Sequence, residues 1–190
     1  MENKGTRELR TERLILRPWK ESDAEEAFAN WMNDPDVTKH LTWTPHGDVS
    51  LTRALLKLRE EECKRPECYH WAIVLKEGNV LIGDIEAGTV DEYQATGGIG
   101  YCLGKAWWGK GLMTEALTEV LRYCFEEVGF YRINGSHAAE NIGSSRVMEK
   151  CGLVYEGTRR KAYRLLQTGE RVDIVERGLL REEYLKRKLS

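Results

Sequence analysis

A predicted strand that turns into a long helix across two glycines constrains this chain more than any other feature. The strand covers residues 99–103, and the helix after Gly111 carries an apolar stripe with the period of about 3.6 residues that is typical of an amphipathic helix. The stripe consists of Met113, Ala116, Leu117, Val120, Leu121, Cys124, Phe125 and Val128. Two glycines at this junction predict a tight strand-to-helix turn.

The start of this helix is a candidate site for a phosphate. The first backbone N–H groups of a helix have no partner within it, and the helix dipole places partial positive charge at the same end. Gly109 and Gly111 let an anion come close to the backbone, and Lys110 adds a cation between them. Gly-x-Gly alone also fits a loop that merely begins a core helix, so both interpretations stay open here.

Two common nucleotide-binding loops do not match this region. A Walker A loop fails because Ala106 follows Gly104 and Lys105, and because Ile99 stands where the first glycine is required. A dinucleotide-binding G-x-G-x-x-G loop fails because Leu103 stands where the third glycine is required. The sequence therefore favours neither of these nucleotide folds.

The composition is that of a globular protein of one domain. The chain has 190 residues, 41% hydrophobic and 32% charged, and its formal net charge of −2 gives no reason to expect a nucleic-acid partner. Five cysteines without a Cys-x-x-Cys pair favour reduced thiols, and four histidines without zinc-like spacing predict no metal. No signal peptide and no apolar run of membrane-spanning length is found, so no membrane contact is predicted and the cytoplasm is the expected location.

Apolar patterns predict the remaining elements. Strands are expected at residues 13–18, 69–75, 80–90, 131–137, 155–165 and 171–180. Helices are expected after a capping box at Ser22–Glu25, over residues 50–64 with Leu51, Ala54, Leu55 and Leu58 inward, and from Asn141 to a cap at Gly152. Residues 1–8 are expected to be loose and residues 37–48 to form a loop. Because a helix separates the strands at 99–103 and 131–137, these two are predicted to be a parallel pair in a mixed α/β sheet.

The element order and four motifs together resemble the GCN5-related N-acetyltransferase (GNAT) superfamily. The motifs are Thr11–Pro18, Trp108–Ala116, Glu140–Leu153 and the hairpin from Gly157 to Asp173. Within the superfamily the chain is similar to the ribosomal-protein N-terminal acetyltransferases. The resemblance covers residues 8–185, one acetyltransferase domain. It implies a mixed, mostly antiparallel sheet flanked by helices, whose central parallel pair splays apart to admit the pantetheine arm of acetyl-CoA.

The resemblance assigns the cosubstrate, acetyl-CoA or coenzyme A, to three parts of the chain. The strand residues Tyr101, Cys102 and Leu103 would pair with the pantetheine through their backbone. The turn residues Gly109, Lys110, Gly111, Leu112, Met113 and Thr114 would wrap the pyrophosphate. Asn141 would touch the pantetheine from the other side, with Ser144 near the thioester sulfur.

Four positions depart from the family pattern. Trp108 stands where the phosphate loop usually begins with Gln or Arg, and Met113 stands at a position of a small residue. Met148 replaces the tyrosine that serves many members as general acid. Tyr163 stands at the counterpart of a glutamate that acts as base in one ribosomal-protein acetyltransferase. The fold and the cosubstrate implied by the resemblance survive these departures, whereas the family's acid and base do not carry over to this chain.

Three side chains are candidates for the chemistry of amine attack on the thioester. Glu86 could take the proton of the amine through a water molecule, or it could be a solvated strand residue. Ser144 could orient or protonate the leaving sulfur, or it could cap a helix, and Tyr163 is the alternative acid. A backbone N–H of the strand at 99–103 could stabilise the oxyanion.

The magnitude of amine pKa values favours an α-amine as the acceptor. An α-amine has a reference pKa of ~7.8, so roughly a tenth is neutral at pH 7, whereas only about one lysine amine in 2,500 is neutral. The predicted acceptor is therefore a protein N-terminus, with a ribosomal protein as the class that the resemblance suggests.

Other acceptors and functions remain open. A small cationic amine would need an acidic pocket, for which Asp34, Asp36, Asp48, Asp91 and Glu92 are available in loops. A non-catalytic acyl-CoA sensor is the alternative from a different class, and a homodimer is left open as well.

Overall fold

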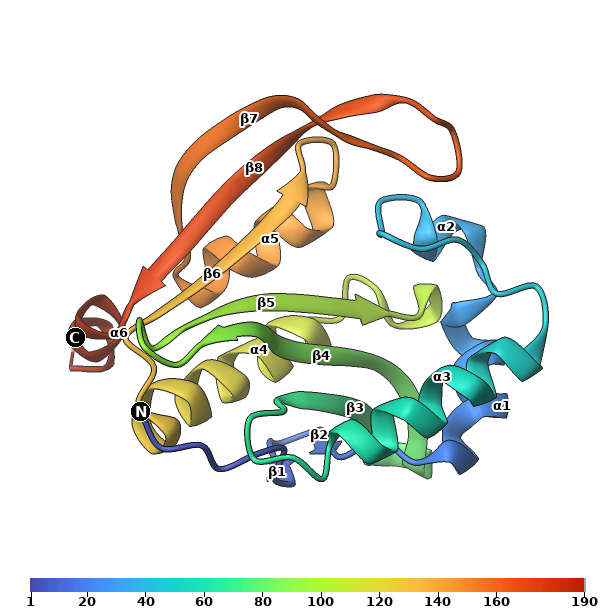
Figure 1. Ribbon diagram of the computed structural model, residues 1–190, viewed down its shortest axis with the longest axis horizontal. Coiled ribbons are helices and arrows are strands. Elements are labelled where there is room, and N and C mark those ends of the chain that lie inside the picture. The colour runs from blue at the N-terminus through green and yellow to red at the C-terminus, as the bar shows by residue number, and fades with distance from the viewer. Residues whose placement is uncertain (190) are drawn as a thin grey trace.

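The computed structural model describes residues 1–189, except for the side chain of Thr89, and its core is one mixed sheet of eight strands in the order β1-β2-β3-β4-β5-β6-β8-β7 (Figure 1). The strands are β1 (Leu9–Arg10), β2 (Leu14–Arg17), β3 (His70–Leu75), β4 (Val80–Asp91), β5 (Thr96–Leu103), β6 (Arg132–Ala138), β7 (Val154–Arg164) and β8 (Arg171–Leu180). All neighbours are antiparallel except β5 and β6, which are parallel as predicted. The mixed α/β fold is thereby confirmed.

Helices cover both faces of the sheet (Figure 1). They are α1 (Ala24–Ala27, extended by a wider turn over Phe28–Met32), α2 (Pro35–Thr38), α3 (Val49–Glu62), α4 (Leu112–Arg122, extended by a wider turn over Tyr123–Val128), α5 (Ile142–Cys151) and α6 (Arg181–Lys188). α1 and α3 pack on one face, and α4 packs on the other with α5 beside it. A crossover helix between β5 and β6 is what makes these two strands parallel.

The apolar stripe of α4 forms the centre of the larger core. All eight of its predicted residues are buried, and they pack against Ile73, Ile85 and Ile99 of the central strands. Full burial of one such aliphatic side chain contributes about 1.5–3 kcal/mol. The apolar stripe therefore holds α4 firmly on the sheet, and this fixes the position of its N-terminus.

The parallel pair separates halfway along its length. The pairing of β5 with β6 runs from Thr96–Arg132 to Ile99–Gly135, yet β5 continues to Leu103 and β6 to Ala138. In Figure 1 the arm of β6, β8 and β7 diverges from β5 accordingly. Beyond Ile99 and Gly135, the edges of β5 and β6 that face each other are thus left without a paired strand in the described part of the chain.

The inward face of α3 differs from the prediction. Thr52 and Leu56 are fully buried, whereas Leu51 and Leu58 are 56% and 63% exposed. Thr52 tolerates burial because its hydroxyl hydrogen-bonds to His46 Nδ1 at 2.7 Å. The leucine pattern was therefore wrong about the phase of this helix.

The expectation for the N-terminal residues was also wrong. The amide of Glu2 donates to the carbonyl of Val128 at 2.9 Å, and the Tyr123 hydroxyl donates to the carbonyl of Gly5 at 2.8 Å. Because these partners come from distant parts of the chain, local polarity did not reveal them. The first turn near α1 likewise begins earlier than predicted, since the carboxylate of Asp23 accepts from the amide of Lys20 at 3.0 Å.

Candidate active site

The turn between β5 and α4 has the backbone that its glycines predict. Gly109 and Gly111 have φ values of 74° and 76°, in the left-handed region that favours glycine. Gly111 is the N-cap of α4, and no side chain of the described residues caps that helix. The amides of Leu112, Met113 and Thr114 are therefore available to an anion, which fits the pyrophosphate of acetyl-CoA.

Two side chains from the segment before β2 hold this turn. Arg13 donates from Nη1 to the carbonyl of Lys110 at 3.0 Å and from Nε to Glu115 at 2.7 Å. Thr11 donates its hydroxyl hydrogen to Glu115 at 2.5 Å. Burial alone would raise the pKa of Glu115, but the hydrogen bonds from Thr11 and Arg13 outweigh it and lower the pKa. The two motifs that carried the resemblance thus meet in one network.

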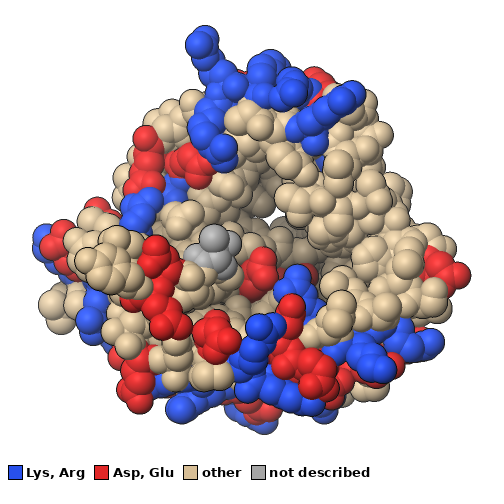
Figure 2. Space-filling view, viewed as in Figure 1, with Lys and Arg blue, Asp and Glu red and all other residues tan. Residues whose placement is uncertain are grey.

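A cavity of about 320 Å³ opens where β5 and β6 separate, and Figure 2 shows a hollow at the centre of this face. From the two strands its lining includes Ile99, Gly100, Tyr101, Cys102, Ser136, His137 and Ala138. From α5 and its cap it includes Asn141, Ser144 and Met148, and from the loop before α3 it includes His40, Leu41, Thr42 and Trp43. Arg59, His70, Asp84 and Glu86 complete it.

Several residues assigned to acetyl-CoA meet at this cavity. Tyr101, Cys102, Asn141 and Ser144 all contribute to its lining. Leu103 does not, but the Trp108 indole donates to its carbonyl at 2.6 Å and so ties the phosphate turn to the end of β5.

Within the turn, the side chains of Leu112 and Met113 are buried in the core of α4, with exposures of 3% and 5%. Only their backbone is therefore free to meet a cosubstrate. Burial of Met113 also explains why a larger side chain is tolerated at this position of a small residue.

The first turn of α5 shows which residue caps the helix. Asn141 Oδ1 accepts from the amide of Ser144 at 3.1 Å, so Asn141 is the cap. The alternative that Ser144 caps α5 was therefore wrong. Ser144 lines the cavity, and its carbonyl accepts from the Tyr101 hydroxyl at 3.1 Å.

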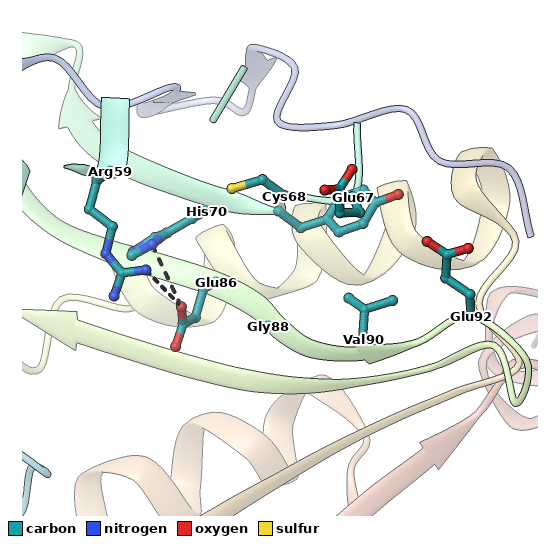
Figure 3. A pocket seen from close by; sticks show the side chains of 9 residues that line it. Arg59, Glu67, Cys68, His70, Glu86, Gly88, Val90 and Glu92 are labelled. Atoms are coloured by element: carbon teal, nitrogen blue, oxygen red, sulfur yellow. Dashed lines mark ion pairs between the residues drawn. The ribbon is translucent and has the colours of Figure 1, made fainter. Parts of the chain in front are cut away.

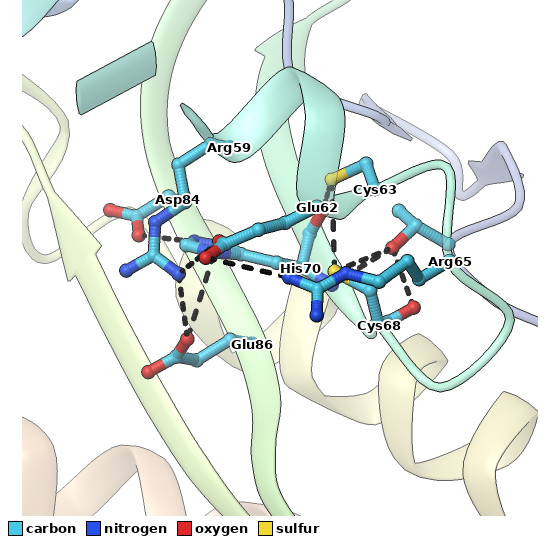
Figure 4. Close-up of polar contacts among 9 residues, drawn as sticks. Arg59, Glu62, Cys63, Arg65, Cys68, His70, Asp84 and Glu86 are labelled. Atoms are coloured by element: carbon cyan, nitrogen blue, oxygen red, sulfur yellow. Dashed lines mark hydrogen bonds and ion pairs between the residues drawn. The ribbon is translucent and has the colours of Figure 1, made fainter. Parts of the chain in front are cut away.

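A carboxylate–imidazole chain (Figure 4) lines the same cavity as Ser144. The buried His70 pairs through Nε2 with Asp84 at 2.9 Å, and its Nδ1 lies 3.6 Å from Glu86. Arg59 Nη1 lies 4.0 Å from the same carboxylate. His70 Nδ1 is buried without a hydrogen bond, so this ring nitrogen can accept a proton or a water when Asp84 holds the hydrogen on Nε2.

Glycine makes room for Glu86 on the sheet. Gly100 lies opposite Glu86 in the β4–β5 pairing. A Cβ at Gly100 would lie 2.9 Å from Glu86 Oε1 and 3.2 Å from Glu86 Cγ. The carboxylate therefore leans over β5, toward the place where the acetyl thioester is predicted.

A second cavity of about 350 Å³ adjoins the first (Figure 3). Both linings include Arg59, His70 and Glu86, so these three side chains stand at the junction. The other residues of the second lining are Glu67, Cys68, Tyr69, Gly88, Val90 and Glu92. Carboxylates outnumber cations along this wall.

Most of the loop carboxylates considered for a cationic substrate have other partners. Asp34 accepts from the amide of Asp36, Asp48 from that of Ser50, and Asp91 from that of Gln94, at 2.7–2.9 Å. They serve as turn and helix caps. Asp36 pairs with Lys105, which lowers the pKa of that aspartate. Only Glu92 of this set lines a cavity.

Tyr163 lies apart from both cavities. It packs beside Leu165, Val172 and Ile174 in the β7–β8 hairpin, and neither lining includes it. Its assignment as an acid stays a prediction, as do the roles of Ser144 and Glu86.

No helix within residues 1–189 is long and apolar enough to span a membrane. No group of three or more His, Cys, Asp or Glu side chains there is placed to hold a metal ion.

Comparisons with known proteins agree with the geometry. The family model of the acetyltransferase (GNAT) domain matches residues 13–154. An uncharacterized N-acetyltransferase, p20 of Bacillus licheniformis, is 31% identical over 176 residues, covering 93% of this chain and 97% of that protein. YdaF of Bacillus subtilis, named as a candidate ribosomal N-acetyltransferase, is 33% identical over 104 residues, covering 55% of this chain and 56% of that protein.

A solved structure shows the same fold. The crystal structure of a GNAT-family acetyltransferase from Bacillus anthracis has a TM-score of 0.81 and 27% identity, and the match covers 93% of this chain and 100% of that one. The splayed strands, the uncapped start of α4 and these matches lead to one conclusion. The chain belongs to the GNAT family and is an N-acetyltransferase that uses acetyl-CoA as its acetyl donor.

Proposed function

We propose that this enzyme acetylates the α-amine of a protein N-terminus, with a ribosomal protein as the substrate class. The observation that carries the proposal is the junction of the two cavities at Glu86. The first cavity holds the predicted thioester site, and the second offers space for residues that follow the acceptor amine. The name of the related YdaF protein supports the ribosomal class.

In the proposed reaction, the neutral amine attacks the acetyl carbonyl between β5 and Glu86. A backbone N–H at the free edge of β5 donates to the oxyanion. Glu86 accepts the proton of the amine, directly or through one water, and its carboxylate lies 4.0 Å from the Arg59 guanidinium. Ser144 faces the leaving sulfur from α5. When the tetrahedral intermediate collapses, the C–S bond breaks and the sulfur takes up a proton from the Ser144 hydroxyl or from water, so that coenzyme A departs as a thiol.

The test is to locate the acetyl group by mass spectrometry. Two peptides of one sequence with an internal lysine, one with a free and one with a blocked N-terminus, are incubated with acetyl-CoA and the enzyme. Acetylation of the free α-amine alone is expected, because roughly a tenth of α-amines is neutral at pH 7 and hardly any lysine amine is. Acetyl groups mainly on lysine would reject the proposal.

Peptide length gives a second readout of the same proposal. If residues after the acceptor lie in the second cavity, the Michaelis constant should fall several-fold from a dipeptide to a tetrapeptide. An unchanged constant would mean that only the first residue is bound.

A small polyamine is the second candidate, because Glu67, Glu86 and Glu92 give the second cavity an acidic wall with Arg59 as its cation. A polyamine with a kcat/KM above that of every peptide in the panel would favour this candidate instead.

A further inference from the structure

Two cysteines lie side by side at the wall of the second cavity (Figure 4). Cys63 is the C-cap of α3, and Cys68 ends the loop that leads to β3. Their sulfur atoms are 3.9 Å apart, and both thiols are half-buried. The residues between them, 64–67, are all exposed.

The surroundings of this pair favour a thiolate on Cys63. The hydrogen bond from Cys68 lowers the pKa of Cys63 most, and against the effect of burial the backbone amide of Trp19, the Thr6 hydroxyl and the charge of His70 lower it further, to about 6. An ordinary thiol has a pKa of about 8.5 and is only a few per cent ionised at pH 7. Cys63 is therefore the nucleophile of the pair.

Both cysteines are also tied to the start of β3. Cys63 Sγ lies 3.4 Å from the carbonyl of His70. The Thr6 hydroxyl donates to the carbonyl of Cys68 at 2.9 Å and accepts from the amide of His70 at 3.0 Å. A change at the sulfur atoms is thus transmitted to the strand that carries His70.

We propose that Cys63 and Cys68 form a peroxide-sensitive pair that closes reversibly into a disulfide at the wall of the acceptor cavity. The Cys63 thiolate attacks one oxygen of a hydroperoxide, the O–O bond breaks, and hydroxide or alkoxide leaves and takes up a proton. The Cys68 thiol then attacks the sulfur of the resulting sulfenic acid, the S–O bond breaks, and water leaves with the thiol proton. Two thiols are oxidised by two electrons, and the peroxide is reduced to water and a second water or alcohol.

The loop can accommodate this closure. A disulfide has an S–S distance of ~2.05 Å, so the sulfur atoms must approach by roughly 2 Å. The exposed residues 64–67 are free of core packing and can follow. The other cysteines differ: burial raises the pKa of Cys102, Cys124 and Cys151, so their thiols stay protonated near neutral pH.

Closure changes the wall that faces the acceptor. Cys68 and its neighbour Glu67 line the second cavity. Glu62, next to Cys63, pairs with Arg59 at 3.2 Å, and Arg59 in turn approaches Glu86. Where the second cavity holds the acceptor, as proposed above, oxidation should raise the Michaelis constant for the acceptor several-fold. The Michaelis constant for acetyl-CoA should stay unchanged, since the predicted pyrophosphate site is at the start of α4 and α4 covers the opposite face of the sheet.

The chemical step is tested by mass spectrometry of the full chain after treatment with a slight excess of hydrogen peroxide. We expect the loss of two hydrogens, a peptide map that links Cys63 to Cys68, and full reversal by dithiothreitol. The rate should fall as the pH drops from about 7 to about 5, because Cys63, with a pKa of about 6, then becomes protonated. The other titratable and charged groups near the pair are Arg59, Glu62, Arg65 and His70.

Three variants make the assignment specific. Cys63→Ser should not react with peroxide, and Cys68→Ser should give a sulfenic acid on Cys63 that dimedone captures. Cys151→Ser is the matched control, since Cys151 is also half-buried, and it should oxidise like the unchanged protein. Melting curves check that each variant is folded.

Unmodified Cys63 and Cys68 after peroxide treatment would overturn the proposal, and so would oxidation of Cys63 to a sulfinic acid while Cys68 stays free. A disulfide that leaves the acceptor Michaelis constant unchanged would overturn its coupling to the active site. The thiol measurements need no acceptor, so they hold or fail separately from the proposed function.

Discussion

Gly100 shows how one missing side chain shapes the active site. Gly100→Ala would place a Cβ 2.9 Å from Glu86 Oε1, the flexible end of the proposed base. We expect kcat/KM to fall roughly tenfold or more, about 1.4 kcal/mol, with little change in melting temperature, because a surface carboxylate can move aside. Gly157→Ala is the control, since no atom lies within 4 Å of its Cβ position. Full activity of Gly100→Ala would mean that the position of Glu86 is not critical.

Substitutions at Ser144 and Asn141 distinguish a role in the reaction from a role as helix cap. Because Asn141 caps α5, Ser144→Ala should leave stability nearly unchanged and lower kcat by roughly ten- to a hundredfold, with a constant Michaelis constant for acetyl-CoA. Asn141→Ala should cost about 1 kcal/mol of stability. Steady-state kinetics and denaturant unfolding of both variants provide the measurement. If Ser144→Ala turns over at the full rate, the sulfur leaves without help from this hydroxyl.

At the scale of elements, periodicity predicted α4 and the central strands because their apolar residues are buried in the core. The cap at Gly152 also agrees with the sequence pattern. The predicted inward face of α3 was wrong because two exposed leucines, Leu51 and Leu58, outweigh one buried threonine in a local pattern. α6 has too few apolar residues for a stripe, and it is held by contacts such as the stacking of Tyr184 on Phe125 at 5.1 Å.

The corrected phase of α3 can be tested by stability. Leu56→Ala removes a fully buried side chain and should lower the free energy of unfolding by about 2–5 kcal/mol. Leu58→Ala, two residues along the same helix, should change it by at most about 0.5 kcal/mol, because Leu58 is 63% exposed. Urea unfolding of the two variants measures the difference. Equal losses in the free energy of unfolding would support the inward-facing leucines that the sequence predicted.

For the whole molecule, the sequence predicted the backbone of the turn before α4 better than the side chains that meet around Glu86. The phosphate turn is local, so the spacing of Gly109 and Gly111 was sufficient. His70, Asp84 and Arg59 come from two strands and a helix, and only the register that sets His70 opposite Glu86 brings them together. A one-residue slip of that hairpin would have placed them on opposite faces.

The predicted acetyl-CoA site at the start of α4 implies that acetyl-CoA stabilises the fold. Acetyl-CoA at a hundred times its dissociation constant should add about 2.7 kcal/mol to the free energy of unfolding. Gly111→Val should remove this gain, because a β-branched residue is strained at a φ of 76° and crowds the anion. Thermal unfolding with and without acetyl-CoA measures both. No shift in the unchanged protein would contradict the assignment of the turn.

The most direct test of the account compares coenzyme A release by the unchanged enzyme and by Glu86→Gln, with a free N-terminal peptide as acceptor. If Glu86 takes the amine proton where the two cavities join, kcat/KM should fall about a hundredfold near pH 7. It should recover in part near pH 9, where an α-amine with a pKa of ~7.8 is already neutral. A variant with the same kcat/KM as the unchanged enzyme near pH 7 would contradict the account.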